Sequence, residues 1–400
     1  MNINQGMSMS TFYGENPSLS SPKCVKNDRP LGIFTKSQVI HAQQGFQRVH
    51  DFLLQDQSAK LLPRERVGNC LKKRIDKDKL REVKYNESRK KAHWANVQRC
   101  GSIWSCPVCA KQITEKRREE LKQAVNTWQT RHQGAIQLLT LTFSHSKSES
   151  LKSLLQRQKK AYKIFLETTK VKNILKKMGV VHKVRSFEVT YGDNGWHPHF
   201  HILMFNKYIF VSADLKKNLS ELWIKACVSA GLSAPSMKHG LDLRDGKYAS
   251  QYVSKWGLEH ELTKGHIKKG KENSLTPFDL LQLSIEDEEV FFKKPSKLFQ
   301  EFAISVKGSR QLVWSRGLKQ LLKIEDKTDE ELAEETENEA ISLRTVDEYI
   351  FSLLCHYQKR HHFLKALEDD WENGCFGTGS AENLLIELLE LETTRLSEVA

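Results

Sequence analysis

Three histidines occupy alternate positions in the stretch Trp196-His197-Pro198-His199-Phe200-His201. Successive side chains of a β-strand point to opposite faces, so this alternation places all three imidazoles on one face of a strand. The apolar run Ile202-Leu203-Met204-Phe205 follows directly and predicts that the strand enters a core. A single strand histidine is most often a hydrogen-bonded, half-buried residue, but three in alternation are hard to assign to packing. The pattern therefore favours a strand that binds a metal ion.

The strand before the histidines is expected to form a β-hairpin with them. The connecting residues Gly192-Asp193-Asn194-Gly195 are typical of a turn and predict a four-residue loop. If Tyr191 pairs with Trp196 across this loop, Glu188 lies opposite His199. Directly opposed residues share a face, with Cβ atoms about 5 Å apart. A slip of one residue turns Glu188 to the other face, so the prediction depends on this register.

A metal ion on this strand can use only part of the histidine row. At a rise of about 3.3 Å per residue, His197 and His201 are roughly 13 Å apart, too far to share one ion. Two adjacent imidazoles can lean toward an ion between them, and Glu188 can supply a third ligand. The predicted site is therefore His199, His201 and Glu188, with His197 as the remaining candidate. Two nitrogens and one carboxylate suit Mn or Mg when water and phosphate oxygens complete the coordination.

Two tyrosines and a lysine recur at helical spacing about 50 residues downstream. Tyr248, Tyr252 and Lys255 are expected on one face of a helix. A tyrosine oxygen can attack a phosphodiester and keep the DNA end as a phosphotyrosyl ester, while a metal polarises the phosphate and a lysine neutralises charge. Alone, such a tyrosine pair more often contributes to packing. Its interpretation as a nucleophile therefore depends on the histidine strand upstream.

Hydrophobic patterns elsewhere predict an α+β fold in which helices flank an antiparallel sheet. The run AIQLLTLTFS at 135–144 is typical of a central strand beside the two hairpin strands. Spacing and boundary residues predict helices over 114–129, 151–178, 215–230 and 247–256, and in the C-terminal part over 346–369 and 381–396. The acidic run 325–339 has few aromatic residues and is expected to be a linker.

The formal net charge is +14, and it is distributed unevenly. Residues 321–400 contain 7 Lys and Arg against 20 Asp and Glu, which leaves 56 basic and 29 acidic residues in the first 320. A basic surplus of this size is typical of a surface that binds a polyanion, most commonly nucleic acid. The alternative is a generically basic protein without such a partner.

Of the eight cysteines, Cys100, Cys106 and Cys109 lie close together in the sequence. The pair Cys106-Pro107-Val108-Cys109 has a turn spacing that suits zinc, and such clustering in a chain without an export signal indicates metal binding rather than disulfides. Cys100 is the expected third ligand, and Cys70 or His93 can complete a tetrahedron. Free buried thiols are the alternative.

A closed zinc site of this kind would be structural, and it would brace a basic segment that contacts DNA. Basic side chains are frequent on both sides of the cysteines. The candidate DNA contacts are Lys90, Lys91, Arg99, Lys111, Lys116, Arg117 and Arg118.

At these residues the chain resembles the HUH endonucleases, specifically the replication initiator proteins of bacterial rolling-circle plasmids. The similarity covers roughly residues 66–318 and follows the order of the family's motifs. It comprises Cys-Pro-Val-Cys at 106–109, Leu-Thr-Leu-Thr at 139–142, the histidine motif within 188–203, Tyr-Val-Ser-Lys at 252–255 and the segment 307–318. The histidine motif followed by Tyr-x-x-Lys is specific, whereas the threonine-rich strand is not.

The resemblance implies a metal site on the sheet face with the tyrosine helix above it. It also implies nicking at a double-strand origin, covalent 5′ attachment, recruitment of a host helicase and strand closure after one round. The family's nucleophile corresponds to Tyr252. Tyr248 stands where many plasmid initiators have a carboxylate that activates water, so termination is either transfer to Tyr248 or hydrolysis.

Four consecutive segments are expected. They are an N-terminal extension that is partly disordered (1–60), a basic zinc-binding segment (61–130), the nicking-joining domain (131–320), and an acidic linker with a helical C-terminal segment (321–400). The N-terminal residues lack the pattern of a signal peptide, and no run of 18 or more apolar residues predicts a membrane span. The expectation is a cytoplasmic protein without a membrane partner.

Two alternative functions remain open. A transposase or conjugative relaxase would use the same chemistry on a different DNA site. A non-catalytic, zinc-dependent DNA-binding regulator would bind DNA with a steep salt dependence and would not cleave it.

Overall fold

The computed structural model describes residues 50–87, 89–209, 212–255, 274–287, 293–334, 340–375 and 377–399. The predicted N-terminal extension therefore lies largely outside the described residues. The chain divides into two compact units, one built from 1–53, 69–99 and 335–400, the other from 54–68 and 100–334. Each unit thus combines stretches that are far apart in the sequence. No helix in the described ranges is both long and apolar enough to cross a membrane.

The unit containing 100–334 has an α+β fold built on an antiparallel sheet, as the sequence predicted. The strand order is β6-β3-β5-β4-β7, and β8 also pairs with β4. Its strands are β3 (Ala135–Leu141), β4 (Val180–Gly192), β5 (Gly195–Asn206), β6 (Leu241–Arg244), β7 (Ser274–Leu275) and β8 (Leu312–Trp314). Its helices are α2 (Pro107–Arg131), α3 (Leu151–Glu167), α4 (Thr169–Lys177), α5 (Ala213–Ser229), α6 (Gly246–Lys255), α8 (Pro277–Leu283), α9 (Pro295–Val306), α10 (Leu318–Leu321) and α11 (Asp329–Glu334).

The hairpin β4–β5 has the predicted register, with Tyr191 opposite Trp196 and Glu188 opposite His199. The predicted four-residue loop is wrong by one pair, because the ladder continues to Gly192 opposite Gly195 and leaves a two-residue turn. Gly195 has φ +87°, and a Cβ there would lie 3.0 Å from the Cα of Lys147. Only glycine combines that backbone conformation with so close an approach, which lets the strands pair up to the turn.

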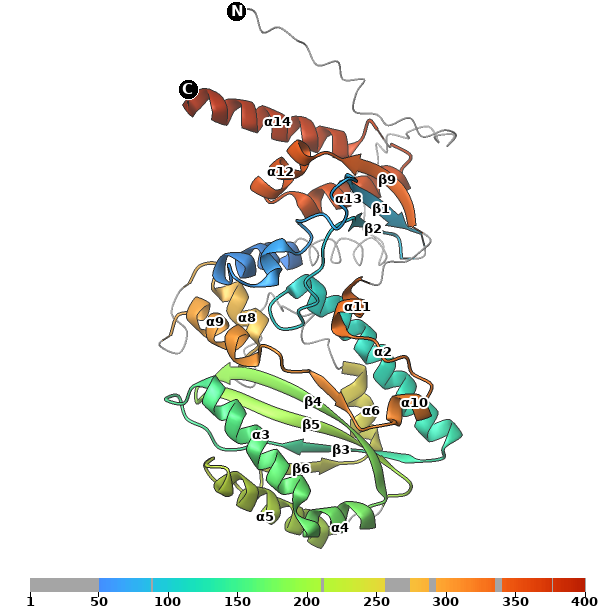
Figure 1. Cartoon of the computed structure of the whole chain (residues 1–400), viewed down its shortest axis with the longest axis vertical. Helices are drawn as coiled ribbons and strands as arrows, with labels where there is room; N and C mark the ends of the chain where they lie inside the picture. The colour runs from blue at the N-terminus through green and yellow to red at the C-terminus, as the bar shows by residue number, and fades with distance from the viewer. Residues whose placement is uncertain are drawn as a thin grey trace, which may run out of the picture. The chain divides into compact units, whose positions relative to one another are not determined.

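The two faces of β5 have different partners. The histidine face continues into Leu203 and Phe205, which lie in a core cluster with residues of α2 and α6. The opposite face presents Trp196 to Phe302 of α9 and Phe200 to Tyr162 of α3. In Figure 1, α3 lies across the sheet on this side. The alternation of β5 therefore separates a row of polar groups from a continuous apolar face.

The predicted single helix over 151–178 is wrong, because the chain forms α3 and α4 with a break at Thr168. Thr168 has φ −62° and ψ 122°, an extended conformation that ends the helical hydrogen-bond ladder. Its backbone N–H still donates to the Ile164 and Phe165 carbonyls. Phe165 before the break and Val171 after it are both fully buried. The bend thus keeps the apolar faces of both helices in the core.

The other unit contains a second antiparallel sheet of order β2-β1-β9. The predicted helix over 346–369 is two helices, separated near Gln358, which has φ 55°. Its strands are β1 (Arg81–Asn86), β2 (Lys91–Ala95) and β9 (Ala340–Val346), and its helices are α12 (Glu348–His356), α13 (Arg360–Glu372) and α14 (Ser380–Val399). Trp94 of β2 packs between Phe351 and Phe363, with ring centroids 5.1 and 6.0 Å away.

Two parts of the acidic C-terminal region differ from the predicted linker and helices. Residues Asp329–Glu334 form α11. Asp329, its first residue, accepts hydrogen bonds from Arg117 of α2 and so holds α11 against that helix. Strand β9 was missed, because its sequence, AISLRTV, pairs with β1 from more than 250 residues away. Local patterns do not contain such a long-range pairing.

Trp128 of α2 ties that helix to the sheet, and Gly134 makes room for it. The Trp128 indole N–H donates to the Asn206 carbonyl at 3.1 Å. A Cβ at position 134 would lie 2.1 Å from that indole nitrogen. We expect Gly134→Ala to displace the indole and to lower the free energy of unfolding by about 1–3 kcal/mol.

Chemical denaturation of the purified chain measures this effect. Gly68→Ala is the matched control, because a Cβ at Gly68 meets nothing within 4 Å. Equal denaturation midpoints for the two variants would contradict the proposed role of Gly134.

Candidate metal and tyrosine site

The structure brings Glu188, His199 and His201 into one group that can hold a metal ion. Their ligand atoms all lie within 4.8 Å of one another. The Nε2 atoms of His199 and His201 lie 3.3 and 3.4 Å from the same Glu188 oxygen, Oε2. Glu188 comes from β4 and the histidines from β5, so the group depends on the hairpin register.

Hydrogen bonds on the far side of each ring orient the two imidazoles. His199 Nδ1 lies 3.3 Å from the His197 carbonyl, to which it donates. His201 Nδ1 lies 2.9 Å from the hydroxyl of Thr140 on β3. With both Nδ1 atoms engaged, the Nε2 atoms face Glu188. Such outer contacts set the tautomer and direction of metal-binding histidines.

Thr140 had no role of its own in the sequence analysis, although it stood in the threonine-rich strand motif. Its contact follows from the antiparallel pairing of β3 with β5, which places Thr140 opposite His201. Opposed residues share a face, so the alternation of Thr140 and Thr142 was a signal that could have identified it. The signal could be used only if β3 was known to lie next to β5.

The Glu188 carboxyl is held in its ionised form. Burial alone would raise the pKa of this group, but hydrogen bonds from His199 and His201 outweigh burial and hold its pKa well below the ordinary value. A half-buried carboxylate beside two imidazoles is a ready anionic ligand for a divalent cation.

Tyr252 of α6 reaches this group. Its hydroxyl donates to Oε1 of Glu188 at 2.7 Å, and its ring centroid lies 4.7 Å from that of His201. Ala249 and Val253 on the same helix are buried in the core cluster against β3 and β5, which fixes the helix over the sheet. The predicted juxtaposition of phenol and imidazoles is therefore present.

Tyr248 and Lys255 take other positions on α6. The Tyr248 side chain is 48% exposed, and its ring centroid lies 4.9 Å from the guanidinium carbon of Arg244. Lys255 is the last residue of α6, and its side chain lies outside the described residues.

His197 lies beside the metal group and is paired with a different residue. Its Nδ1 is 2.7 Å from Nε2 of His145, a residue of the loop after β3 that the sequence analysis did not identify. His145 in turn uses Nδ1 to donate to the Asn194 carbonyl in the hairpin turn, at 3.0 Å. Burial, with smaller contributions from His199 and His145, lowers the pKa of His197 to about 3, so this ring stays neutral.

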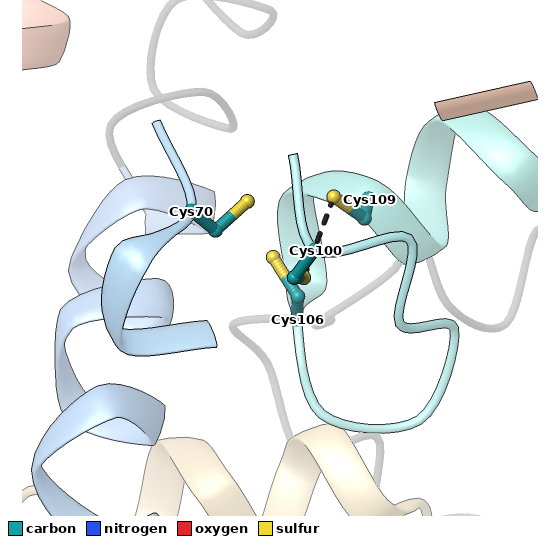
Figure 2. A group of neighbouring side chains, drawn as sticks. All are labelled: Cys70, Cys100, Cys106 and Cys109. Atoms are coloured by element: carbon teal, nitrogen blue, oxygen red, sulfur yellow. Dashed lines mark hydrogen bonds between the residues drawn. The ribbon is translucent and has the colours of Figure 1, made fainter. Parts of the chain in front are cut away.

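The cysteines that the sequence singled out form a second group. Ligand atoms of Cys70, Cys100, Cys106 and Cys109 all lie within 4.8 Å of one another, and all four residues are buried. Figure 2 shows Cys106 and Cys109 at the start of α2, with Cys100 on the loop that precedes this helix. Cys70 is thus the fourth member, and His93 is not part of the group.

Two of the four cysteines lie at the N-terminus of α2. Pro107 occupies the first turn of α2 and Cys106 is its N-cap, so the thiols of Cys106 and Cys109 lie at the positive end of a helix dipole. The side-chain amide of Gln55 donates to Cys106 Sγ at 3.3 Å. Helix N-termini and nearby donors stabilise the thiolate form that binds metals. Four sulfur donors fit a soft, tetrahedral ion.

The predicted DNA contacts occupy two kinds of environment. Lys90 and Lys91 are exposed at the turn between β1 and β2, and Arg99 is half-buried. Arg117 and Arg118 have side chains only 11% and 13% exposed, and both face carboxylates within their own unit. Lys111 and Lys116 of α2 are half-buried. That these seven residues contact DNA stays a prediction.

Comparison with known proteins places this site in a family. Residues 90–362 match the Rep_1 family model, described as Replication protein. The chain is 25% identical over 292 residues to a protein named Protein rep from Streptomyces lividans, covering 56% of this chain and 64% of that protein. It is 28% identical over 131 residues to a protein named Neomycin resistance protein from Streptomyces cyanogenus, covering 26% of this chain and 30% of that protein.

The chain spans less than two thirds of the length of these relatives. No solved structure matches it. The family match covers more than half of the chain and contains the histidine–tyrosine site and three of the four grouped cysteines. On this basis the chain belongs to the Rep_1 replication protein family.

Proposed function

We propose that this protein is a plasmid replication initiator that nicks one DNA strand at a double-strand origin and later rejoins it. The observation that supports this most is the hydrogen bond between the Tyr252 hydroxyl and Glu188, a member of the Glu188–His199–His201 group. A phenol adjacent to a divalent-cation site is arranged to attack a phosphate that the cation also holds.

The nicking step is a transfer of one phosphate. The Tyr252 oxygen forms a bond to phosphorus, the bond to the 3′ oxygen breaks, and the leaving oxygen takes the electron pair and a proton from solvent. Glu188 accepts the hydrogen bond from the phenol and so directs the attacking oxygen. Because the low pKa of Glu188 makes it a weak base, it orients the phenol, and the phenolic proton passes to solvent as the bond to phosphorus forms.

The 5′-phosphotyrosyl ester keeps the energy of the broken bond. A free 3′ hydroxyl can therefore attack the ester, restore the phosphodiester and release Tyr252 without ATP. Tyr248, exposed on the preceding turn of α6, is the proposed acceptor of a second strand. Termination then proceeds by transfer to Tyr248 or by hydrolysis. As the resemblance to plasmid initiators implies, we expect a host helicase to be recruited at the nick.

The metal at Glu188, His199 and His201 is proposed to be Mn or Mg, with water and phosphate oxygens as further ligands. When bound, such an ion polarises the scissile phosphate and stabilises charge on the departing 3′ oxygen. The cysteine group is proposed to bind zinc in a structural role, because four thiolates leave no open position for substrate.

Replacing the nucleophile tests the proposal directly. We expect Tyr252→Phe to reduce covalent attachment to DNA by roughly a thousandfold or more, because the attacking oxygen is lost while the helix is retained. The assay incubates the protein with Mn and supercoiled plasmid carrying candidate origins, then detects SDS-stable adducts and maps the nick.

Tyr248→Phe is the control, and it should retain the first attachment. An adduct that persists in Tyr252→Phe and disappears in Tyr248→Phe would give the nucleophile role to Tyr248. Cleavage only at an element end or a transfer origin would indicate a transposase or relaxase. Binding to DNA without cleavage in Mn or Mg would indicate a regulator.

The hydroxyl of Thr140 gives a second test, because it orients His201 without being a ligand. We expect Thr140→Val, which keeps the shape and removes the hydroxyl, to weaken Mn binding by roughly tenfold. Thr140→Ser should restore most of the affinity. Isothermal titration with Mn in the absence of DNA measures the effect, and unchanged affinity in Thr140→Val would show that the hydrogen bond does not support the site.

The cysteine group predicts the zinc content of the purified chain. We expect Cys109→Ser to lose most of its zinc, because one of four ligands is removed. Cys227→Ser is the matched control, since Cys227 is equally buried, on α5, and lies outside the group. Elemental analysis gives the zinc-to-protein ratio, and a wild-type ratio in Cys109→Ser would exclude that residue as a ligand.

A further inference from the structure

A cavity of about 990 Å³ lies next to β8 in the unit that holds the tyrosine site. Most of its lining comes from three segments: the loop 100–105, the stretch 308–317 that includes β8, and residues within 324–330 before and within the start of α11. The remaining lining residues are Glu65, Arg66, Arg117, Lys319 and Gln320. The stretch 308–317 lies within the segment 307–318, which the proposed chemistry does not use.

Strand β8, which lines the cavity, presents one face on the same side of the sheet as the histidines. Leu312 of β8 lies opposite Ser186 of β4, and Ser186 lies opposite His201 of β5. Opposed residues share a face, and neighbouring strands are about 4.8 Å apart, so β8 runs roughly 10 Å from the histidine strand. Trp314 and Tyr252 pack against the same core cluster. One short strand of DNA can therefore reach both places.

The charges around the cavity leave a positive surplus. Each lining carboxylate already has a cationic partner, in the pairs Asp326–Lys319 (3.1 Å), Asp329–Arg117 (2.9 Å), Glu330–Arg66 (3.6 Å) and Glu65–Lys307 (2.7 Å). Arg310 and Arg316 also line the cavity, are exposed, and have no ion pair with any described residue. They stand on either side of β8 and offer two guanidinium groups to phosphates.

The cavity also has an aromatic wall. Trp314 is half-buried and lines the cavity, and its ring centroid lies 5.3 Å from Nζ of Lys319. Trp104 lines it too, but its indole donates to the Ser309 carbonyl and its ring packs on Phe187 and Phe302. Trp104 therefore supports the wall, and Trp314 is the ring against which a base can stack.

We propose that this cavity binds single-stranded DNA beside the scissile phosphate, with Arg310 and Arg316 contacting backbone phosphates and Trp314 stacking on an unpaired base. The proposal rests on the proposed nicking function, because it assigns the path of the strand that Tyr252 attacks. Aromatic stacking combined with cationic contacts is the general mode of single-strand binding. A paired base in a duplex cannot enter a cavity of this kind without leaving its stack.

Binding of a short oligonucleotide tests the charge part of the proposal. The probe is fluorescein-labelled oligothymidylate, about twelve nucleotides long, bound to full-length Tyr252→Phe so that nicking plays no part. We expect Arg310→Gln with Arg316→Gln to weaken binding by roughly tenfold. The matched control is Lys170→Gln with Lys172→Gln on α4, which removes two exposed lysines that do not line the cavity.

The control should bind the oligonucleotide nearly as well as the parent. If both double substitutions weakened binding equally, the loss would come from the change in overall charge, and the proposal would be overturned. Weakened binding of duplex DNA, with single-strand binding unchanged, would make the arginines duplex contacts and would also overturn it.

Photochemical cross-linking tests the aromatic part. Oligothymidylate carrying 5-iodouracil at single positions is irradiated with the protein, and the modified tryptic peptide is identified by mass spectrometry. We expect the peptide Gln311–Arg316, which contains Trp314, to carry the adduct. Adducts confined to other peptides would place the strand elsewhere. Neither assay needs cleavage, so failure of the nicking proposal and failure of the cavity proposal give different results.

Discussion

The register of the β4–β5 hairpin is the constraint on which the site depends. It sets Glu188 opposite His199, and a shift of one residue would turn the carboxylate to the opposite, apolar face. The two-residue turn holds this register, because the ladder continues to the pair Gly192–Gly195 and leaves no slack. A half-buried carboxylate without its imidazole partners would lose its compensating hydrogen bonds, so the fold and the site favour the same register.

Strand β5 contributes both to the hydrophobic core and to the candidate metal site. Along the same face of β5, His199 and His201 are followed by Leu203 and Phe205, which pack with α2 and α6. The packing that buries this apolar end also fixes α6, and α6 positions Tyr252 over the polar end. The distance between phenol and carboxylate is thus determined by core packing on a neighbouring turn, and the site needs no flexible loop to assemble it.

The local parts of this arrangement were predictable from sequence. The alternation of the histidines predicted the face that they share, and the turn residues predicted the hairpin pairing. The position of Glu188 opposite His199 followed from both. Contacts that depend on distant pairing were not predictable. Thr140 meets His201 only because β3 lies beside β5, and His145 meets His197 through a loop with no periodic pattern. The break at Thr168 and the strand β9 were missed because tertiary packing, not local propensity, decides them.

The loop between Cys100 and Cys106 connects the cysteine group with the cavity beside β8. Its ends carry thiols of the group, and its middle, including Trp104, forms a wall of the cavity. Fixing both ends of a short loop removes most of its conformational freedom, so the wall is ordered before DNA binds. Such preorganisation lowers the entropy lost on binding. A metal ion at the cysteine group would therefore affect the proposed strand binding without touching DNA.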